Sequence, residues 1–257
     1  QTVHHGLWDY DVASAPNLVD IVVDGKPIRA VAPVSKTGFT YVFDRVSGEP
    51  VWPIEERPVP PSDVPGERAH PTQPFPTKPA PFDRQGISED DLIDFTPEIA
   101  AAARELAEEF VLGPIFTPPI VRGSNGKRST FVVPGAGGGA GYPGATVDPE
   151  TGIIYIPSLT RPMGMSLIPP PDDTSDWPYI ITLDRQVGPF GLPLLKPPYR
   201  RITAIDLNTG EHVWQIPFGK GPANHPMLEH LDLPPLGTAN SDVLHEGGVL
   251  ITKTLLI

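Results

Sequence analysis

The residues best suited to chemistry are a carboxylate and an ammonium near the start of the chain. Asp9 follows Trp8 in the segment HHGLWDYD, and Lys36 comes 27 positions later in the turn VSKTG. A carboxylate can accept the proton of a substrate hydroxyl, and an ammonium can stabilise negative charge that develops on a reacting group. On the residues alone, a turn-capping role is the simpler interpretation of Asp9, and an exposed turn residue is the alternative for Lys36.

A glycine-rich segment, PGAGGGAGYPG, is a second candidate. Gly139, Gly141 and Gly144 have the spacing G-x-G-x-x-G of dinucleotide-binding loops. Such a loop needs a helix N-terminus directly after it to hold the phosphates. The residues that follow, TVDPETGIIYIP, predict a strand, a turn and a strand instead. We therefore set the dinucleotide interpretation aside.

The elements that position these residues contain a repeated turn. An Asp, a Gly and a Trp lie four residues apart between two strand-like runs, a pattern typical of a hairpin turn. Two full copies and one copy without the Trp occur: Asp44, Gly48 and Trp52; Asp206, Gly210 and Trp214; Asp148 and Gly152. Their spacing gives a period of roughly 50 residues, which is typical of β-propeller blades. The sequence predicts an all-β fold, a partial propeller of about four to five blades, with both Trp residues packed between neighbouring sheets.

The chain is expected to form a single domain over residues 1–257, with insertions at about 53–112 and 161–199. Residues 18–52, 115–158 and 200–257 should form antiparallel sheets, and the turn Asp24-Gly25 should close a hairpin. The Pro-rich stretch 53–81 is interpreted as an extended loop without regular structure. Thr96 and Pro97 begin the one short helix, near 96–111.

Composition excludes several classes of protein. The net charge of −12 argues against nucleic acid or an anionic membrane surface as a partner. There is no cysteine, and no apolar run is long enough to span a membrane. His225, His230 and His245 share no spacing typical of a metal site, so none is predicted from them. The chain starts at Gln1 and stops within an apolar run, so we expect a piece of a longer protein.

Several segments together resemble one family. HHGLWDYD, VSKTG, HPTQPFPTKP, GPIFTPP and the Asp/Gly/Trp turns, in this order, are similar to the dehydrogenases that depend on pyrroloquinoline quinone (PQQ), in particular the membrane-bound glucose dehydrogenase branch. The resemblance implies an eight-bladed propeller that holds PQQ with Ca²⁺ or Mg²⁺. It also implies a periplasmic enzyme that oxidises a sugar or polyol and passes electrons to a ubiquinone-type acceptor, with membrane association only through a segment preceding this one.

The resemblance also assigns roles near the start of the chain. Asp9 corresponds to the general base, and Lys36 to the basic residue that contacts the quinone oxygens of PQQ. Asp11 is interpreted as a structural partner. The neighbours Trp8 and Tyr10 are expected to limit the access of water to Asp9.

Three further positions are carried over. Tyr142 corresponds to an aromatic residue near the cofactor, although Gly141 replaces the expected Asn. His4, and less directly His5, are candidates for cofactor or substrate contact, the alternative being a packed loop histidine. Gly6 stands where relatives often have Asp. No metal ligand is assigned in this chain, because the resemblance puts the ligands upstream of it, and the segment alone is expected to be inactive. The rival interpretation is a non-catalytic propeller that binds proteins.

Overall fold

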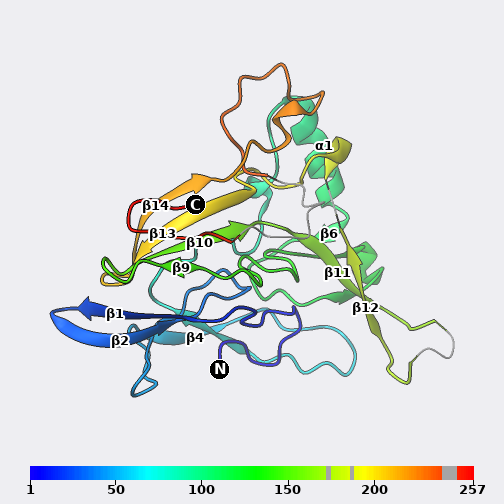
Figure 1. Cartoon of the computed structure of the whole chain (residues 1–257). Coiled ribbons are helices and arrows are strands. Elements are labelled where there is room, and N and C mark those ends of the chain that lie inside the picture. Colours follow the sequence, from blue (N-terminus) through cyan, green and yellow to red (C-terminus); the bar gives the residue numbers. More distant parts are fainter. Residues whose placement is uncertain (172–174, 186–187, 239–247) are drawn as a thin grey trace.

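The computed structural model describes residues 1–171, 175–185, 188–238 and 248–257. In these ranges the chain is mostly β, with strands in four sheets and one α-helix, as predicted (Figure 1). The helix is α1 (Pro97–Ala107). The strands are β1 (Asn17–Val23), β2 (Lys26–Ala32), β3 (Phe43–Asp44), β4 (Ile54–Pro58), β5 (Thr72–Pro76), β6 (Phe110–Val111), β7 (Ile120–Val121), β8 (Ser129–Val132), β9 (Thr146–Val147), β10 (Ile153–Leu159), β11 (Met163–Ile168), β12 (Ile180–Asp184), β13 (Arg200–Asp206) and β14 (Glu211–Pro217).

The first sheet, in the order β1-β2-β3, begins with the predicted hairpin. Asp24 and Gly25 form its turn with φ of 50° and 76°. Both residue types tolerate this left-handed conformation, which matches the twist of the two strands. Along β1, Val19 and Ile21 are buried and their neighbours face outward, as the alternation of a half-buried strand requires.

The repeated Asp/Gly turns have one geometry. In each copy the Gly N–H donates to the Asp carbonyl oxygen, and the Gly has positive φ. The pairs and their N···O distances are Asp44 with Gly48 at 2.8 Å, Asp148 with Gly152 at 2.9 Å, and Asp206 with Gly210 at 2.7 Å. The second turn joins β9 to β10 and the third joins β13 to β14, within one sheet of order β14-β13-β10-β9. The hairpin prediction is confirmed for the second and third turns. The first closes only an isolated antiparallel bridge, from Phe43 to Pro50, because the next strand, β4, lies in another sheet.

These two sheets share a core. Its buried members come from both sheets and include Val19, Ile21, Ala30, Ala32, Ile154, Ile156 and Ile205. Asn208, in the third turn, ties the sheets together, because its side-chain oxygen accepts the Val22 N–H at 2.9 Å and its amide donates to the Thr151 carbonyl oxygen at 2.9 Å.

The two repeat Trp residues differ in environment. Trp52 packs against the turn of the second sheet, since a Cβ on Gly210 would lie 3.1 Å from the Trp52 ring. This agrees with packing between sheets. Trp214 lies instead against Tyr155 of its own sheet, with ring centroids 5.7 Å apart, and is 36% exposed. Its predicted packing between sheets is therefore wrong within the described part of the chain.

The third sheet has the order β12-β11-β8-β6, with β7 paired to β11. The pairs β6–β8 and β7–β11 are parallel, so the expectation of purely antiparallel sheets is wrong here. β11 and β12 lie in the second insertion. Helix α1 packs nearby with Ile99 and Ala103 buried, and its first turn is capped by Thr96, whose hydroxyl accepts the Ile99 N–H at 3.2 Å. None of the described helices is long and apolar enough to cross a membrane.

The Pro-rich stretch 53–81 is not the structureless loop expected. β4 and β5 pair antiparallel across five residue pairs as a two-stranded ribbon. In such a ribbon every second N–H points away from the partner strand, so a proline there removes no ladder bond. Pro74 and Pro76 occupy alternate positions of β5, which makes the strand compatible with its composition.

Candidate functional site

Two buried aromatic residues fix the segment that carries Asp9. Trp8 and Tyr10 are 1% and 3% exposed and belong to one apolar cluster. The Trp8 indole N–H donates to the Thr117 carbonyl oxygen at 2.8 Å, and the Tyr10 hydroxyl donates to the Pro134 carbonyl oxygen. Asp9, between them, has a φ of 63°, in the left-handed region that Asp and Asn adopt more readily than other side chains.

Asp9 itself is a surface carboxylate, with 65% of its side chain exposed. The expectation that Trp8 and Tyr10 shield it from water does not hold in this structure, because both rings are buried in the core while Asp9 is not. Burial raises the pKa of the Tyr10 hydroxyl well above its usual value. Tyr10 therefore remains a hydrogen-bond donor at neutral pH, and its anchoring role does not titrate.

Lys36 and the two nearby carboxylates form one cluster. The Lys36 ammonium lies 2.9 Å from Oδ2 of Asp9 and 2.6 Å from Oδ1 of Asp11. The backbone N–H of Lys36 also donates to the Asp11 carbonyl oxygen at 3.2 Å. The Lys36 side chain is 14% exposed. Partial burial lowers its pKa, but the hydrogen bonds and negative charges of Asp11 and Asp9 outweigh this and raise the pKa above its usual value. Lys36 is therefore protonated at neutral pH, and the two carboxylates orient its ammonium.

The glycine-rich segment crosses directly over Lys36. Gly138 has a φ of 76°, and a Cβ there would lie 2.4 Å from Cβ of Lys36, closer than any real contact allows. The next N–H, of Gly139, donates to the Lys36 carbonyl oxygen at 2.9 Å. As predicted, this segment leads into strand and turn, β9 and β10, rather than a helix.

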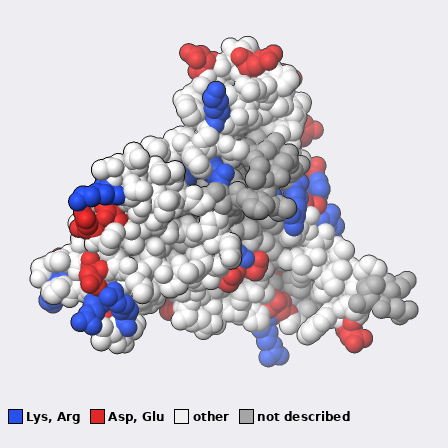
Figure 2. All heavy atoms as spheres, viewed as in Figure 1, with Lys and Arg blue, Asp and Glu red and all other residues white. Residues whose placement is uncertain are grey.

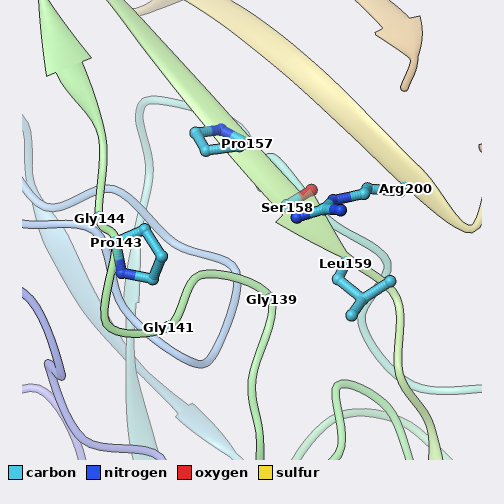
Figure 3. Close-up of a pocket in the computed structure, with 8 residues that line it drawn as sticks. All are labelled: Gly139, Gly141, Pro143, Gly144, Pro157, Ser158, Leu159 and Arg200. Carbon is cyan, nitrogen blue, oxygen red and sulfur yellow. The ribbon is translucent and has the colours of Figure 1, made fainter. Parts of the chain in front are cut away.

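Tyr142, on the same segment, is 89% exposed. A small hollow lies between the glycine-rich segment and the strands β10 and β13 (Figure 3). The hollow is lined by Gly139, Gly141, Pro143, Gly144, Pro157, Ser158, Leu159 and Arg200. Tyr142 is not among these residues, and its cofactor contact stays a prediction.

His4 and His5 bond to the β4–β5 ribbon and its connecting loop. Nε2 of His4 lies 2.8 Å from Oε1 of Glu56, and the His4 N–H donates to the Gln73 side chain at 2.8 Å. Nε2 of His5 lies 2.7 Å from Oε1 of Glu67. His4 thus has the contacts of a packed loop histidine, whereas the side chain of His5 is 52% exposed and bonds Glu67 at the surface. A role in cofactor contact stays a prediction for both.

Within the described ranges, no three His, Asp or Glu side chains are grouped so that they could hold a metal ion. His225 bonds to the Phe190 carbonyl oxygen at 3.0 Å, and His245 lies outside the described residues. On the face drawn in Figure 2, charged side chains form small groups of both signs.

Sequence reasoning missed a buried charged pair beside the Lys36 turn. The side chains of Asp83 and Arg201 are 0% and 6% exposed, with Nη2 of Arg201 3.4 Å from Oδ1 of Asp83. The Thr160 hydroxyl donates to the same oxygen at 2.5 Å. Burial lowers the pKa of Arg201, and the charge of Asp83 opposes this effect. Asp83 belongs to the Pro-rich run PAPFDRQG, whose composition predicts neither burial nor partners so far along the chain.

The chain matches known proteins over its whole length. The family described as "PQQ: Glucose/ethanol/alcohol dehydrogenase, beta-propeller domain" matches residues 1–256. The chain is 33% identical to a quinoprotein glucose dehydrogenase of Escherichia coli over 85% of this chain and 29% of the relative. It is 32% identical to a glycerol dehydrogenase large subunit of Gluconobacter oxydans over 97% of this chain and 37% of the relative. A quinate/shikimate dehydrogenase (quinone) of Acinetobacter baylyi is 28% identical over 97% of this chain and 33% of the relative.

The chain spans about a third of the length of these curated relatives. Among solved structures, a europium-containing methanol dehydrogenase aligns with 19% identity and a TM-score of 0.40, over 81% of this chain and 28% of that structure.

Proposed function

The chain belongs to the PQQ-dependent glucose/ethanol/alcohol dehydrogenase family and is part of its β-propeller domain, and from this we propose that the full-length protein is a quinoprotein dehydrogenase that oxidises a hydroxyl group of a sugar or polyol. The relatives are named for glucose, glycerol and quinate, which share secondary or primary hydroxyl groups. The single structural observation that supports the proposal most is the contact between the Lys36 ammonium and the Asp9 carboxylate.

The residues near Asp9 fit part of a PQQ site. PQQ, when bound, supplies an ortho-quinone that accepts hydride from the carbon bearing the substrate hydroxyl. An ammonium has three N–H groups, and Lys36 uses two of them on Asp9 and Asp11. The third can donate to a quinone oxygen, where a fixed positive charge stabilises the charge gained on reduction.

Asp9 is assigned the role of general base. In the described part of the chain only its Oδ2 makes a hydrogen bond, to Lys36, so Oδ1 is available to accept the hydroxyl proton of a substrate. Because Asp9 is exposed, a substrate can reach it. Its left-handed backbone, between two anchored aromatic residues, fixes the direction of its side chain. Asp11 holds Lys36 from the other side.

Other contacts complete the proposal. Tyr142 and His4 are proposed to contact PQQ, and Ca²⁺ or Mg²⁺ is proposed to be held mainly by residues that this chain does not include. We place the full-length protein in the periplasm, with a ubiquinone-type quinone as electron acceptor; the name of the quinate/shikimate relative includes a quinone.

Reconstitution of the full-length protein tests the proposal. Purified apoprotein is titrated with PQQ in the presence of Ca²⁺, and dye reduction is measured with glucose, glycerol and quinate. We expect cofactor-dependent turnover with at least one of them. Lys36→Ala should weaken PQQ binding and slow turnover by about 10²–10³, the usual effect of losing one such donor. A protein that binds no PQQ would support the rival scaffold function, and unchanged affinity and turnover in Lys36→Ala would remove Lys36 from the site.

A further inference from the structure

Residues 82–85 hold the Lys36 turn in place. The Phe82 N–H donates to the Gly38 carbonyl oxygen at 2.9 Å, and the Gln85 side-chain amide donates to the Thr37 carbonyl oxygen at 2.8 Å. Asp83 lies between these two contacts. A Cβ on Gly38 would lie 3.4 Å from Cβ of Asp83, so Gly38 faces Asp83 at close range.

Asp83 also supports the glycine-rich segment from the same side. A Cβ on Gly139 would lie 3.0 Å from Cβ of Asp83 and 3.4 Å from its Oδ2. Gly139 in turn donates its N–H to the Lys36 carbonyl oxygen. Gly139 therefore lies between the backbone of Lys36 and the side chain of Asp83.

One carboxylate oxygen, Oδ1, connects Asp83 to the second sheet and to residues next to that sheet. Oδ1 accepts the Thr160 hydroxyl at 2.5 Å and the Arg84 N–H at 2.6 Å, and it faces Arg201 at 3.4 Å. Oδ2 is buried without a hydrogen-bond partner among the described residues. A buried carboxylate oxygen without a hydrogen bond costs stability, so its presence calls for an explanation in the fold or the site.

We propose that Asp83, anchored by Thr160 and Arg201, is a positioning residue that sets where the Lys36 turn and the glycine-rich segment meet, and so directs the Lys36 ammonium at Asp9. The consequence for cofactor binding rests on the proposed function; the consequence for the turn does not. Asp83→Asn keeps the shape and the Oδ1 acceptor but removes the charge that faces Arg201, so both contacting segments should loosen.

The experiment combines local hydrogen exchange with a double-mutant cycle in the full-length protein. The variants are Asp83→Asn, Lys36→Ala and the double variant, with Asp184→Asn as matched control. Asp184 is likewise a largely buried carboxylate, 10% exposed, that faces arginine side chains, those of Arg122 and Arg128. It lies at the end of β12, in a different sheet. Amide exchange is followed at residues 35–39 and 138–140, and PQQ affinity is measured by titration with PQQ and Ca²⁺.

We expect Asp83→Asn to speed exchange in both segments while Asp184→Asn leaves them unchanged. Asp83→Asn should weaken PQQ binding about tenfold when Lys36 is present and by less than about twofold in the Lys36→Ala background. The reason is that Asp83 is inferred to act on PQQ through the contact that Lys36 makes with it. Unchanged exchange at 35–39, or equal loss of affinity in both backgrounds, would overturn the inference. If Lys36→Ala alone leaves PQQ affinity unchanged, the proposed function of Lys36 fails, and the exchange data still decide the role of Asp83 in the turn.

Discussion

Asp9→Asn in the full-length protein separates the chemical role of this residue from its structural one. Asn tolerates the φ of 63° as well as Asp does, so the backbone should not change. The lost contact is one ion pair at 2.9 Å in which Asp9 is 65% exposed, and such pairs contribute about 0.2–1 kcal/mol to the free energy of unfolding. Loss of a general base slows turnover by about 10²–10⁴. The predicted change in the activation free energy therefore far exceeds the predicted change in the free energy of unfolding.

The matched control is Asp11→Asn. It removes the companion ion pair of Lys36, at 2.6 Å with Asp11 56% exposed, so its effect on stability should be of the same size. Its turnover should stay close to that of the wild type, because Asp11 is assigned no proton transfer. The assay is substrate-dependent dye reduction by both variants, loaded with PQQ and Ca²⁺, together with urea denaturation. Wild-type turnover in Asp9→Asn, or equally slow turnover in both variants, would refute the assignment of Asp9 as the base.

Two predictions concern stability. Tyr10→Phe removes the bond to the buried Pro134 carbonyl and should lower the free energy of unfolding by about 1–3 kcal/mol; an unchanged urea midpoint would mean that this bond contributes nothing. At Asp184, burial raises the pKa, but hydrogen bonds from Arg122 and Arg128 outweigh it and hold the pKa below its usual value. This stabilisation is fully present above about pH 4 and is lost as the pH falls through the pKa of the folded state. Asp184→Asn should therefore be less stable than the wild type at pH 7, with a difference that shrinks toward pH 3; a constant difference across this range would contradict the argument.

Local turn chemistry made the hairpins predictable. Asp24-Gly25 and the turn from Asp206 to Gly210 are specified by residues that tolerate or require the observed backbone. The β4–β5 ribbon could not be predicted in this way. Its prolines mimic a disordered linker in composition, and only the pairing partner shows that they occupy positions where no ladder bond is needed.

The pairing of two site candidates agrees with their motifs, their environment was not predictable, and their roles stay a prediction. Asp9 and Lys36 were identified from their motifs, and the structure brings them into contact. The exposure of Asp9 depends on which way the buried rings of Trp8 and Tyr10 point, which sequence spacing does not fix. Asp83 was missed because its partners, Thr160 and Arg201, lie far along the chain, and burial of a carboxylate there follows only from the packing of segments brought together by the fold.

The bond from Val22 to Asn208 has a consequence for the kinetics of folding. It joins residues 186 positions apart. Closing so long a loop lowers the entropy of the chain before the two sheets gain any contact energy. The β1–β2 and β13–β14 hairpins close over a few residues and can form within microseconds. Docking of the two sheets should therefore be the slow step, and substitutions at Asn208 should act mainly on the rate at which preformed hairpins find each other.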